Sequence, residues 1–159
     1  MDAELFRKLM GNFATGVTVV TTAVDDRLHG FTANAVASVS LDPLLLLVCV
    51  DKRAHAHREL QRAAAFGVNV LASAQVDISN IFAKSGEPAE GSLRGVPFRI
   101  GGTGAPLIEG CLAWLECVVH DLLEGGDHTI VVGRVVSGTL GAAEPPLVFF
   151  RGRYSRLAD

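Results

Sequence analysis

The sequence lacks the features that mark membrane, nucleic-acid-binding and secreted proteins. Its longest unbroken apolar run, residues 44–50, is far shorter than the roughly 20 residues of a membrane-spanning helix. The net charge is −3 and there is no basic run, so we expect no contact with nucleic acid. The first residues, MDAELFRKLM, are acidic early and contain no signal-peptide core. We therefore predict a cytoplasmic protein that does not bind a membrane.

Cysteine is also scarce, because the chain has only Cys49, Cys111 and Cys117. Their number is odd, their spacing is not that of a metal site, and each lies in an apolar run. This pattern is typical of buried, unpaired cysteines in a reducing compartment. We therefore expect three free thiols.

The common motifs of nucleotide, nucleophile and metal sites are missing too. The segment GGTG, residues 101–104, lacks the spacing of a Rossmann fingerprint, and there is no P-loop. No G-x-S-x-G sequence forms a nucleophile elbow. His55 and His57 are two residues apart, but no third ligand is obvious nearby, so we expect no metal site. If the protein binds a dinucleotide, it does so without a Rossmann fold.

Apolar residues (49%) and glycine (17 residues), in contrast, are plentiful. A chain of 159 residues with a mean hydropathy of +0.35 is long enough for one domain, over residues 1–159, with a substantial core. Runs rich in Val, Thr and aromatic residues predict about seven strands, and short helices are expected near residues 3–13, 55–65 and 74–83.

Two long apolar runs, residues 111–123 and 128–140, are joined by EGGD, which predicts a β-hairpin with glycine at its turn. The sequence shows no regular alternation of strands and helices, so we do not expect a parallel sheet. The pattern predicts a mainly β protein with a few short helices. We expect its antiparallel strands to form a closed or nearly closed barrel, because closure removes exposed strand edges.

Residues 30–43, GFTANAVASVSLDP, alternate small polar and small apolar residues. The stretch predicts a strand to about Ser40, followed by a turn at Asp42-Pro43. Small side chains let a large planar ligand approach the backbone, and short hydroxyl groups can bind its polar tail. An ordinary strand of small residues is the alternative interpretation.

Two further features suggest binding chemistry. Lys52 and Arg53 directly follow a buried strand and precede a predicted helix start, which suits a phosphate group. A solvated turn is the alternative. His128 lies where the glycine turn enters an apolar strand, and it is either a functional residue or a structural residue that caps the turn.

Five segments together resemble the short-chain flavin reductase family, whose fold is the FMN-binding split barrel. Their order and spacing cover nearly the whole chain. The segments are FATGVTVVTT (13–22), GFTANAVASVSLDPLLLLVCV (30–50), FGVNVLASAQVDISNIFA (66–83), CLAWLECVVHDLLEGGDHTIVVGRV (111–135) and PLVFFRGRYSRL (146–157).

The resemblance implies a homodimeric, antiparallel split β-barrel with Greek-key connections. It also implies an NAD(P)H-dependent flavin reductase, which uses NADH or NADPH to reduce FMN or FAD and passes the reduced flavin to a partner monooxygenase. Two alternatives remain: a non-catalytic flavin- or haem-binding split-barrel protein, and a barrel that stores or senses a small apolar ligand.

The resemblance also implies roles for individual residues. The flavin ring and ribityl chain are expected along Thr32, Ala33, Asn34 and Ala35, and the polar tail of the flavin near Ser38, Val39 and Ser40. Phosphates are expected at Lys52, Arg53 and Ala54, the border of the site at Phe82 and Ala83, and the nicotinamide at Asp127, His128 and Tyr154. His128 is the expected catalytic residue. The family often has Ser at position 35 and Ser or Thr around positions 54–57, where this chain has Ala and His, which leaves open FMN versus FAD and how tightly the flavin binds.

Overall fold

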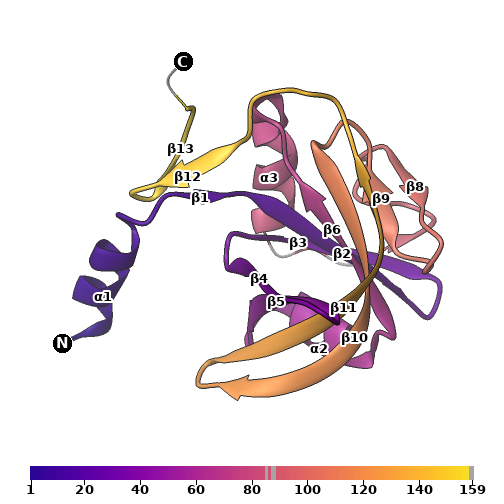
Figure 1. Cartoon of the computed structure of the whole chain (residues 1–159), viewed down its shortest axis with the longest axis horizontal. Coiled ribbons are helices and arrows are strands. Elements are labelled where there is room, and N and C mark those ends of the chain that lie inside the picture. Colours follow the sequence, from indigo (N-terminus) through magenta and orange to yellow (C-terminus); the bar gives the residue numbers. More distant parts are fainter. Residues whose placement is uncertain (85, 87–88, 158–159) are drawn as a thin grey trace.

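The computed structural model describes residues 1–84, 86 and 89–157, and its architecture is mainly β (Figure 1). Eight antiparallel strands form one curved sheet in the order β4–β5–β11–β10–β6–β2–β3–β7. The predicted fold class is confirmed. The strands are β2 (Thr18–Val24), β3 (Arg27–Ala33), β4 (Val36–Leu41), β5 (Leu44–Asp51), β6 (Ala65–Val70), β7 (Ala89–Glu90), β10 (Ala113–Gly125) and β11 (His128–Leu140).

Two smaller sheets and three α-helices complete the described part of the chain. The small sheets contain β1 (Thr15–Gly16), β12 (Val148–Phe150) and β13 (Arg153–Ser155) in one, and β8 (Phe98–Ile100) and β9 (Pro106–Ile108) in the other. The helices are α1 (Ala3–Met10), α2 (His55–Arg62) and α3 (Val76–Ala83), the last preceded by a 3₁₀ turn at Ser73–Gln75. Within the described ranges, no helix combines the length and the apolar character needed to cross a bilayer.

The stretch that was predicted as one strand to Ser40 is two strands, and this part of the prediction is wrong. The strand β3 ends at Ala33 and pairs with β2, whereas β4 begins at Val36 and pairs with β5. The strand β4 is one edge of the large sheet, and β3 lies at the other, where only the short β7 follows it. Asn34 and Ala35 therefore connect strands at opposite edges of the sheet. The described residues of β4 and β7 do not pair, so the barrel is split rather than closed.

The central strands bury side chains on both faces of the sheet, which explains why they are apolar throughout. On β2, Val20 belongs to an inner core cluster together with Val48 and Phe66. Its neighbour Val19 points to the opposite face and belongs to a second cluster, with Ile108 of β9. Successive side chains of a strand point to opposite faces, so two cores require an apolar residue at every position. The chain segments around β8 and β9 cover the second face.

The predicted hairpin is present as β10 and β11. Gly125 pairs with His128, so Gly126 and Asp127 form the turn, and Gly126 has a positive φ of 73° that suits glycine. This geometry places His128 at the first position of β11, opposite Asp51 of β5. The turn thus brings two ionisable residues to the same end of the sheet.

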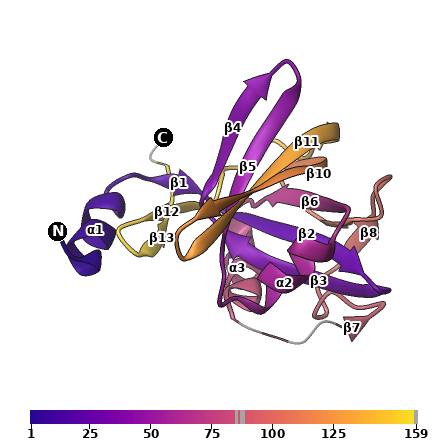
Figure 2. The same cartoon turned by 90° about the horizontal axis from the view of Figure 1, so that it is seen from below.

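The helix α1 stands apart from the barrel (Figure 2). Asp2 caps its N-terminus by accepting a hydrogen bond of 2.8 Å from the Leu5 N–H. No residue of α1 is buried within the chain. Its large apolar side chains are exposed, and so is the next one along the chain: Leu5, Phe6, Leu9, Met10 and Phe13.

Gly133, at the middle of β11, offers a test of the inner core. A Cβ atom at this position would lie 2.4 Å from Cζ of the buried Phe66 ring and 2.9 Å from Cβ of Cys117. We expect Gly133→Ala to lower the free energy of unfolding by about 1–3 kcal/mol, as overpacked cores do. Denaturant unfolding measures the change.

The matched control is Gly16→Ala in β1, where no atom lies within 4 Å of the added Cβ. We expect this control to change the stability by no more than about 0.5 kcal/mol. Equal effects of the two substitutions would contradict the close packing at Gly133.

Candidate functional site

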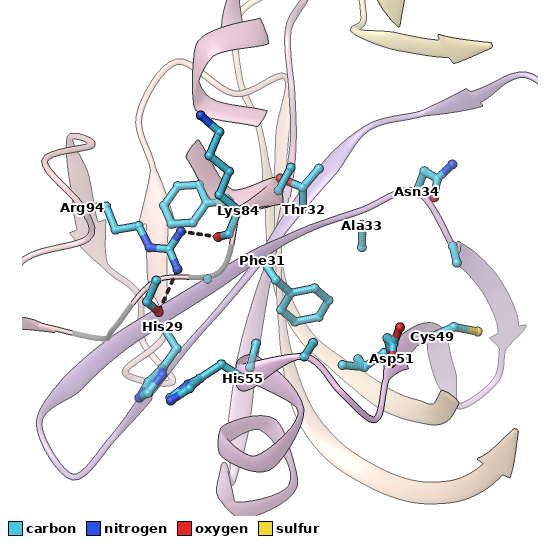
Figure 3. Close-up of a pocket in the computed structure, with 18 of the residues that line it drawn as sticks. His29, Phe31, Thr32, Ala33, Asn34, Cys49, Asp51, His55, Lys84 and Arg94 are labelled. Atoms are coloured by element: carbon cyan, nitrogen blue, oxygen red, sulfur yellow. Dashed lines mark hydrogen bonds between the residues drawn. The ribbon is translucent and has the colours of Figure 1, made fainter. Parts of the chain in front are cut away.

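A cavity of about 270 Å³ lies beside the crossing between β3 and β4 (Figure 3). Its walls come from β3, the crossing itself, the end of β5, the start of α2, the end of α3 and the segment around Arg94. Many of the residues that line it are Gly or Ala, so main-chain atoms form much of the surface. The small residues on the wall are Gly30, Ala33, Ala35, Ala54, Ala56, Ala83 and Gly86.

The structure brings eight of the sequence-predicted site residues to this cavity. They come from four separate stretches of the chain and meet because the sheet is curled. The eight are Thr32, Ala33, Asn34, Ala35, Ala54, Phe82, Ala83 and His128.

The other seven predicted residues do not line the cavity. Ser38, Val39 and Ser40 lie on β4, in a hairpin with β5 that projects from the barrel (Figure 2). The Tyr154 hydroxyl lies 2.7 Å from the Ser79 hydroxyl, and its ring contacts Phe149 edge-on. Lys52, Arg53 and Asp127 lie outside the cavity at its β5–α2 end.

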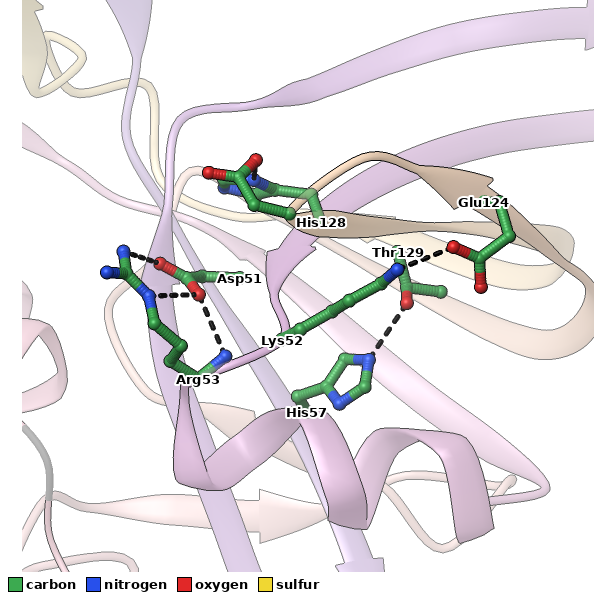
Figure 4. Close-up of polar contacts among 8 residues, drawn as sticks. Asp51, Lys52, Arg53, His57, Glu124, His128 and Thr129 are labelled. Carbon is green, nitrogen blue, oxygen red and sulfur yellow. Dashed lines mark hydrogen bonds and ion pairs between the residues drawn. The ribbon is translucent and has the colours of Figure 1, made fainter. Parts of the chain in front are cut away.

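Both cations expected to bind phosphate are paired with carboxylates (Figure 4). Arg53 donates three hydrogen bonds to Asp51, from its backbone N–H (2.8 Å), Nε (3.1 Å) and Nη2 (2.8 Å). These bonds hold the pKa of Asp51 well below its usual value, so the carboxylate stays ionised. Lys52 pairs with Glu124 and lowers the pKa of that carboxyl. A phosphate therefore has to compete with Asp51 for Arg53.

His128 stands at the rim of the cavity and is tied to its neighbour Asp127. Its Nδ1 lies 2.8 Å from Asp127 Oδ1, and its side chain is 41% exposed. The hydrogen bond with His128 lowers the pKa of Asp127, so this acid remains an anion. With Nδ1 engaged, Nε2 is the ring nitrogen left for a ligand. Asp127 is thus placed to orient the His128 ring rather than to contact a ligand in the cavity.

The end of α3 and Arg94 hold another part of the cavity wall. The Arg94 guanidinium donates to the carbonyl oxygens of Ile81 (2.8 Å), Lys84 (2.7 Å) and Gly86 (3.0 Å), and it lies over the Phe82 ring. Burial lowers the pKa of Arg94. These contacts fix the end of α3 together with Lys84 and Gly86.

The same wall is joined to β3 by a close approach of main chain and ring. Thr32 Oγ1 donates to the Ser79 carbonyl at 2.6 Å. A Cβ atom at Gly30 would lie 2.8 Å from the Phe82 ring, so glycine is required there for β3 to lie against α3.

Sequence reasoning missed several cavity residues. A period of two along β3, counted back from Ala33, leads to Phe31 and His29, so strand alternation could have found both. Asp51, His55 and Arg94 gave no comparable local signal, because their place on the wall depends on how distant segments meet. The full set that was missed is Leu28, His29, Gly30, Phe31, Cys49, Val50, Asp51, His55, Ala56, Lys84, Gly86, Leu93 and Arg94.

The structure places the three cysteines in the following way. Cys49, Cys111 and Cys117 are all free, as predicted, although only Cys111 and Cys117 are fully buried. Burial raises the pKa of these two thiols to about 12, so both stay protonated. Among the residues that the structure describes, no group of three or more His, Cys, Asp or Glu side chains is arranged to hold a metal ion.

Comparison with known families matches residues 10–158 to the flavin reductase like domain. The chain belongs to this flavin reductase-like family. The family predicted from five sequence segments is thereby confirmed, whereas the assignment of residues 1–159 to a single domain stays a prediction.

Two named members of the flavin reductase-like family are similar to this chain over nearly its whole length. The reductase subunit HsaB of a flavin-dependent monooxygenase from Mycobacterium tuberculosis is 38% identical over 157 residues, which is 98% of this chain and 82% of that protein. The solved structure of the NADH:FAD oxidoreductase SgcE6 from Streptomyces globisporus, in complex with NAD and FAD fragments, has a TM-score of 0.91. It is 41% identical and covers 99% of this chain and 93% of the other.

Another relative is longer than this flavin reductase-like chain. A protein from Rhizobium meliloti named "Probable flavin reductase" is 44% identical over 143 residues, which is 86% of this chain. The chain spans only 45% of the length of that relative.

The pairing of Arg53 with Asp51 leads to a prediction about flavin binding. We expect Asp51→Asn to lower the Kd for FAD by about two- to fivefold at low salt, because it releases Arg53 and removes a negative charge from the wall. Salt should shrink the effect by screening. Flavin fluorescence titration at two salt concentrations measures both.

The control is Glu124→Gln, which releases Lys52 without changing a cavity residue, and we expect it to change the Kd less. Weaker binding by Asp51→Asn would show that the carboxylate itself holds the ligand. Replacing both Lys52 and Arg53 by Ala should weaken binding, and most strongly at low salt.

Proposed function

We propose that the protein transfers a hydride from NADH to FAD bound beside the β3–β4 crossing. Flavin reduction follows from membership of the family, and the complex of SgcE6 with NAD and FAD fragments favours this donor and this flavin. The observation that carries the location is the set of Gly and Ala residues in the cavity wall, at the crossing and on the elements that face it, together with Phe31 and Phe82. Small residues let a flat ring approach main-chain N–H and C=O groups.

The residues present fit a flavin nucleotide. The cavity volume of about 270 Å³ is close to the lower limit of small-molecule sites, roughly 300–1,000 Å³, which suits a ligand that remains partly exposed. The bound flavin supplies the two-electron chemistry. Thr32, Ala33, Asn34 and Ala35 would bind its ring and ribityl chain, and Phe82 and Ala83 would border it.

The protein's own contribution is to bind, orient and exclude water. His128, held by Asp127 at the cavity rim, would orient the nicotinamide carboxamide or hold a proton there. Ala54 and the start of α2 would lie near the phosphates. Ser38, Val39, Ser40 and Tyr154 stay proposed as neighbours of the site, on segments that lie outside the cavity.

We also propose a homodimer, in which α1 and the projecting β4–β5 hairpin contact a second copy. This proposal is supported by the apolar side chains that the chain leaves exposed on α1, and by Val39, Leu41 and Leu44 on the hairpin. Exposed clusters of large apolar side chains mark interaction sites. The flavin sites would lie near the interface, because β5 contributes to the cavity wall.

The reduced flavin would pass to a partner monooxygenase in the cytoplasm. Support comes from HsaB, which is the reductase subunit of such an enzyme, and from the three free thiols, which suit a reducing compartment.

Replacing His128 tests the role of this residue in catalysis. We expect His128→Ala to lower kcat/KM for NADH by about tenfold to a hundredfold, with the Kd for FAD and the Tm nearly unchanged. Stopped-flow flavin reduction, FAD titration and thermal unfolding measure the three quantities. If the wild-type protein does not oxidise NADH in the presence of FAD, the proposed function itself is wrong.

His120→Ala is the control, because His120 is exposed on β10 of the same hairpin and does not line the cavity. It should leave kcat/KM unchanged. A His128 variant with a lower Tm and normal hydride transfer per folded molecule would identify His128 as a structural residue of the turn.

Light scattering tests the dimer. We expect the wild-type mass to be about twice 16.8 kDa at micromolar concentration, and the variant Phe6→Glu/Leu9→Glu to be a monomer. Lys8→Gln, on the polar side of α1, is the control and should remain dimeric. A monomeric wild-type protein would contradict the proposal.

A further inference from the structure

A buried histidine and a buried glutamate meet at one end of the cavity. His29 of β3 is 7% exposed and Glu59 of α2 is 9% exposed. His29 Nε2 lies 3.8 Å from Glu59 Oε2, which is within ion-pair range but beyond hydrogen-bonding distance. His29 lines the cavity, and none of the roles proposed above uses it.

The Glu59 carboxylate is held from the other side by a chain of charges that leads to the surface. Arg62 Nη1 donates to Glu59 Oε2 at 3.2 Å, and the same guanidinium pairs with Asp25 in the turn between β2 and β3. The charged and titratable groups that face His29 are Glu59, Arg62 and His55 from α2, and Arg27 from its own strand. Glu59 is the only one of these that favours a positive His29.

Without a ligand, His29 is mostly neutral near pH 7. Burial lowers its pKa below the ordinary value, and the nearby Glu59 only partly opposes this. Among the described residues, Thr15 Oγ1 is the one fully buried side-chain nitrogen or oxygen atom without a hydrogen-bond partner, so no ring nitrogen of His29 is both fully buried and unpartnered. The His29 ring nitrogens make no hydrogen bond to a residue that the structure describes, and His29 lines the cavity, so the ring is placed to offer a nitrogen or an N–H to a ligand there.

The start of α2 lies beside this histidine. The N-cap residue of α2 is Ala54, which offers no side-chain oxygen to the first turn. Ala54, His55 and Ala56 all line the cavity, so the positive end of the helix dipole faces the same space as His29 (Figure 3). Two independent features therefore favour an anion at this end of the cavity.

We propose that His29 binds a phosphate group of the flavin nucleotide and takes up a proton from solvent when it does so. This inference rests on the proposed function, because it requires a flavin nucleotide in the cavity. The protonated ring donates one N–H to the phosphate and directs the other toward Glu59, whose charge Arg62 offsets. Glu59 and Arg62 are positioning residues, since they act through His29.

Protonation of His29 and binding of FAD favour each other, which fixes how the affinity depends on pH. The free protein carries a neutral His29 and the complex a protonated one, so the affinity for FAD falls as the pH rises from about 6 to 8, the range in which histidine titrates. The diphosphate group of FAD stays ionised throughout this range, so the proton belongs to the protein. Riboflavin has the same ring without phosphate, and its binding should not depend on pH.

Calorimetry of the purified protein provides the test. FAD and riboflavin are titrated at pH 7 in buffers of different ionisation enthalpy, and the slope of the binding enthalpy gives the number of protons taken up. We expect a substantial fraction of one proton for FAD and none for riboflavin. His29→Gln should abolish the uptake and weaken FAD binding by about tenfold or more, as the loss of a charge-assisted hydrogen bond does. Riboflavin affinity should be unchanged.

His120→Gln is the matched control and should keep the wild-type proton uptake. Because His29 is buried, its substitution can also unfold the protein, so a second measurement uses the wild type. The NMR shifts of the His29 ring should report a higher pKa with FAD than with riboflavin. Glu59→Gln should reduce the uptake at pH 7.

Equal proton uptake for the two flavins, uptake that survives in His29→Gln, or ring shifts that FAD leaves unchanged would each overturn the inference. If both flavins bind without proton uptake and NADH still reduces them, the proposed function stands and this inference fails. If neither flavin binds, both fail.

Discussion

Two residues, Asn34 and Ala35, connect strands that lie at opposite edges of an eight-stranded sheet. Each residue extends the chain by no more than about 3.6 Å. Such a short link can therefore join the two strands only if the sheet curls until its two edges come close together. The hydrogen bond from the Cys49 N–H to the Ala35 carbonyl, 3.0 Å long, fixes the crossing against β5. The split barrel, its cavity and the meeting of β3 with α2 and α3 all depend on this constraint.

Three cations near the cavity are paired with carboxylates, whereas Arg94 on its wall donates only to carbonyl oxygens. Arg53 is paired with Asp51, Lys52 with Glu124, and Arg62 with both Glu59 and Asp25. A surface with free cations would hold an anionic nucleotide tightly, whereas paired cations give up part of the Coulomb attraction to their own partners. This balance suits the proposed release of the reduced flavin to another protein.

Much of the fold and part of the site could be predicted from the sequence, because the signals were local. The β10–β11 hairpin follows from EGGD between two apolar runs, and the small residues of 32–35 mark the wall where main chain is accessible. The break at Asn34 could not be predicted, since the residues before and after it have similar strand patterns and differ only in their distant partners. The pairing of Lys52 with Glu124 was equally hidden, because 72 residues separate the two. His29 and Phe31 were also missed, although they lie on the same strand face as Ala33 and strand alternation could have predicted them.

The cavity wall also limits how this protein can change over evolution. Gly30, Ala33, Ala35, Ala54, Ala56 and Ala83 already carry the two smallest side chains. Every substitution of an alanine by a residue other than glycine adds volume, and every substitution of Gly30 does so against the Phe82 ring. Mutation at these positions can therefore narrow the range of ligands but hardly widen it. New specificity would have to arise at the larger residues of the wall, such as Phe31, His55 and Arg94, where a side chain can still become smaller.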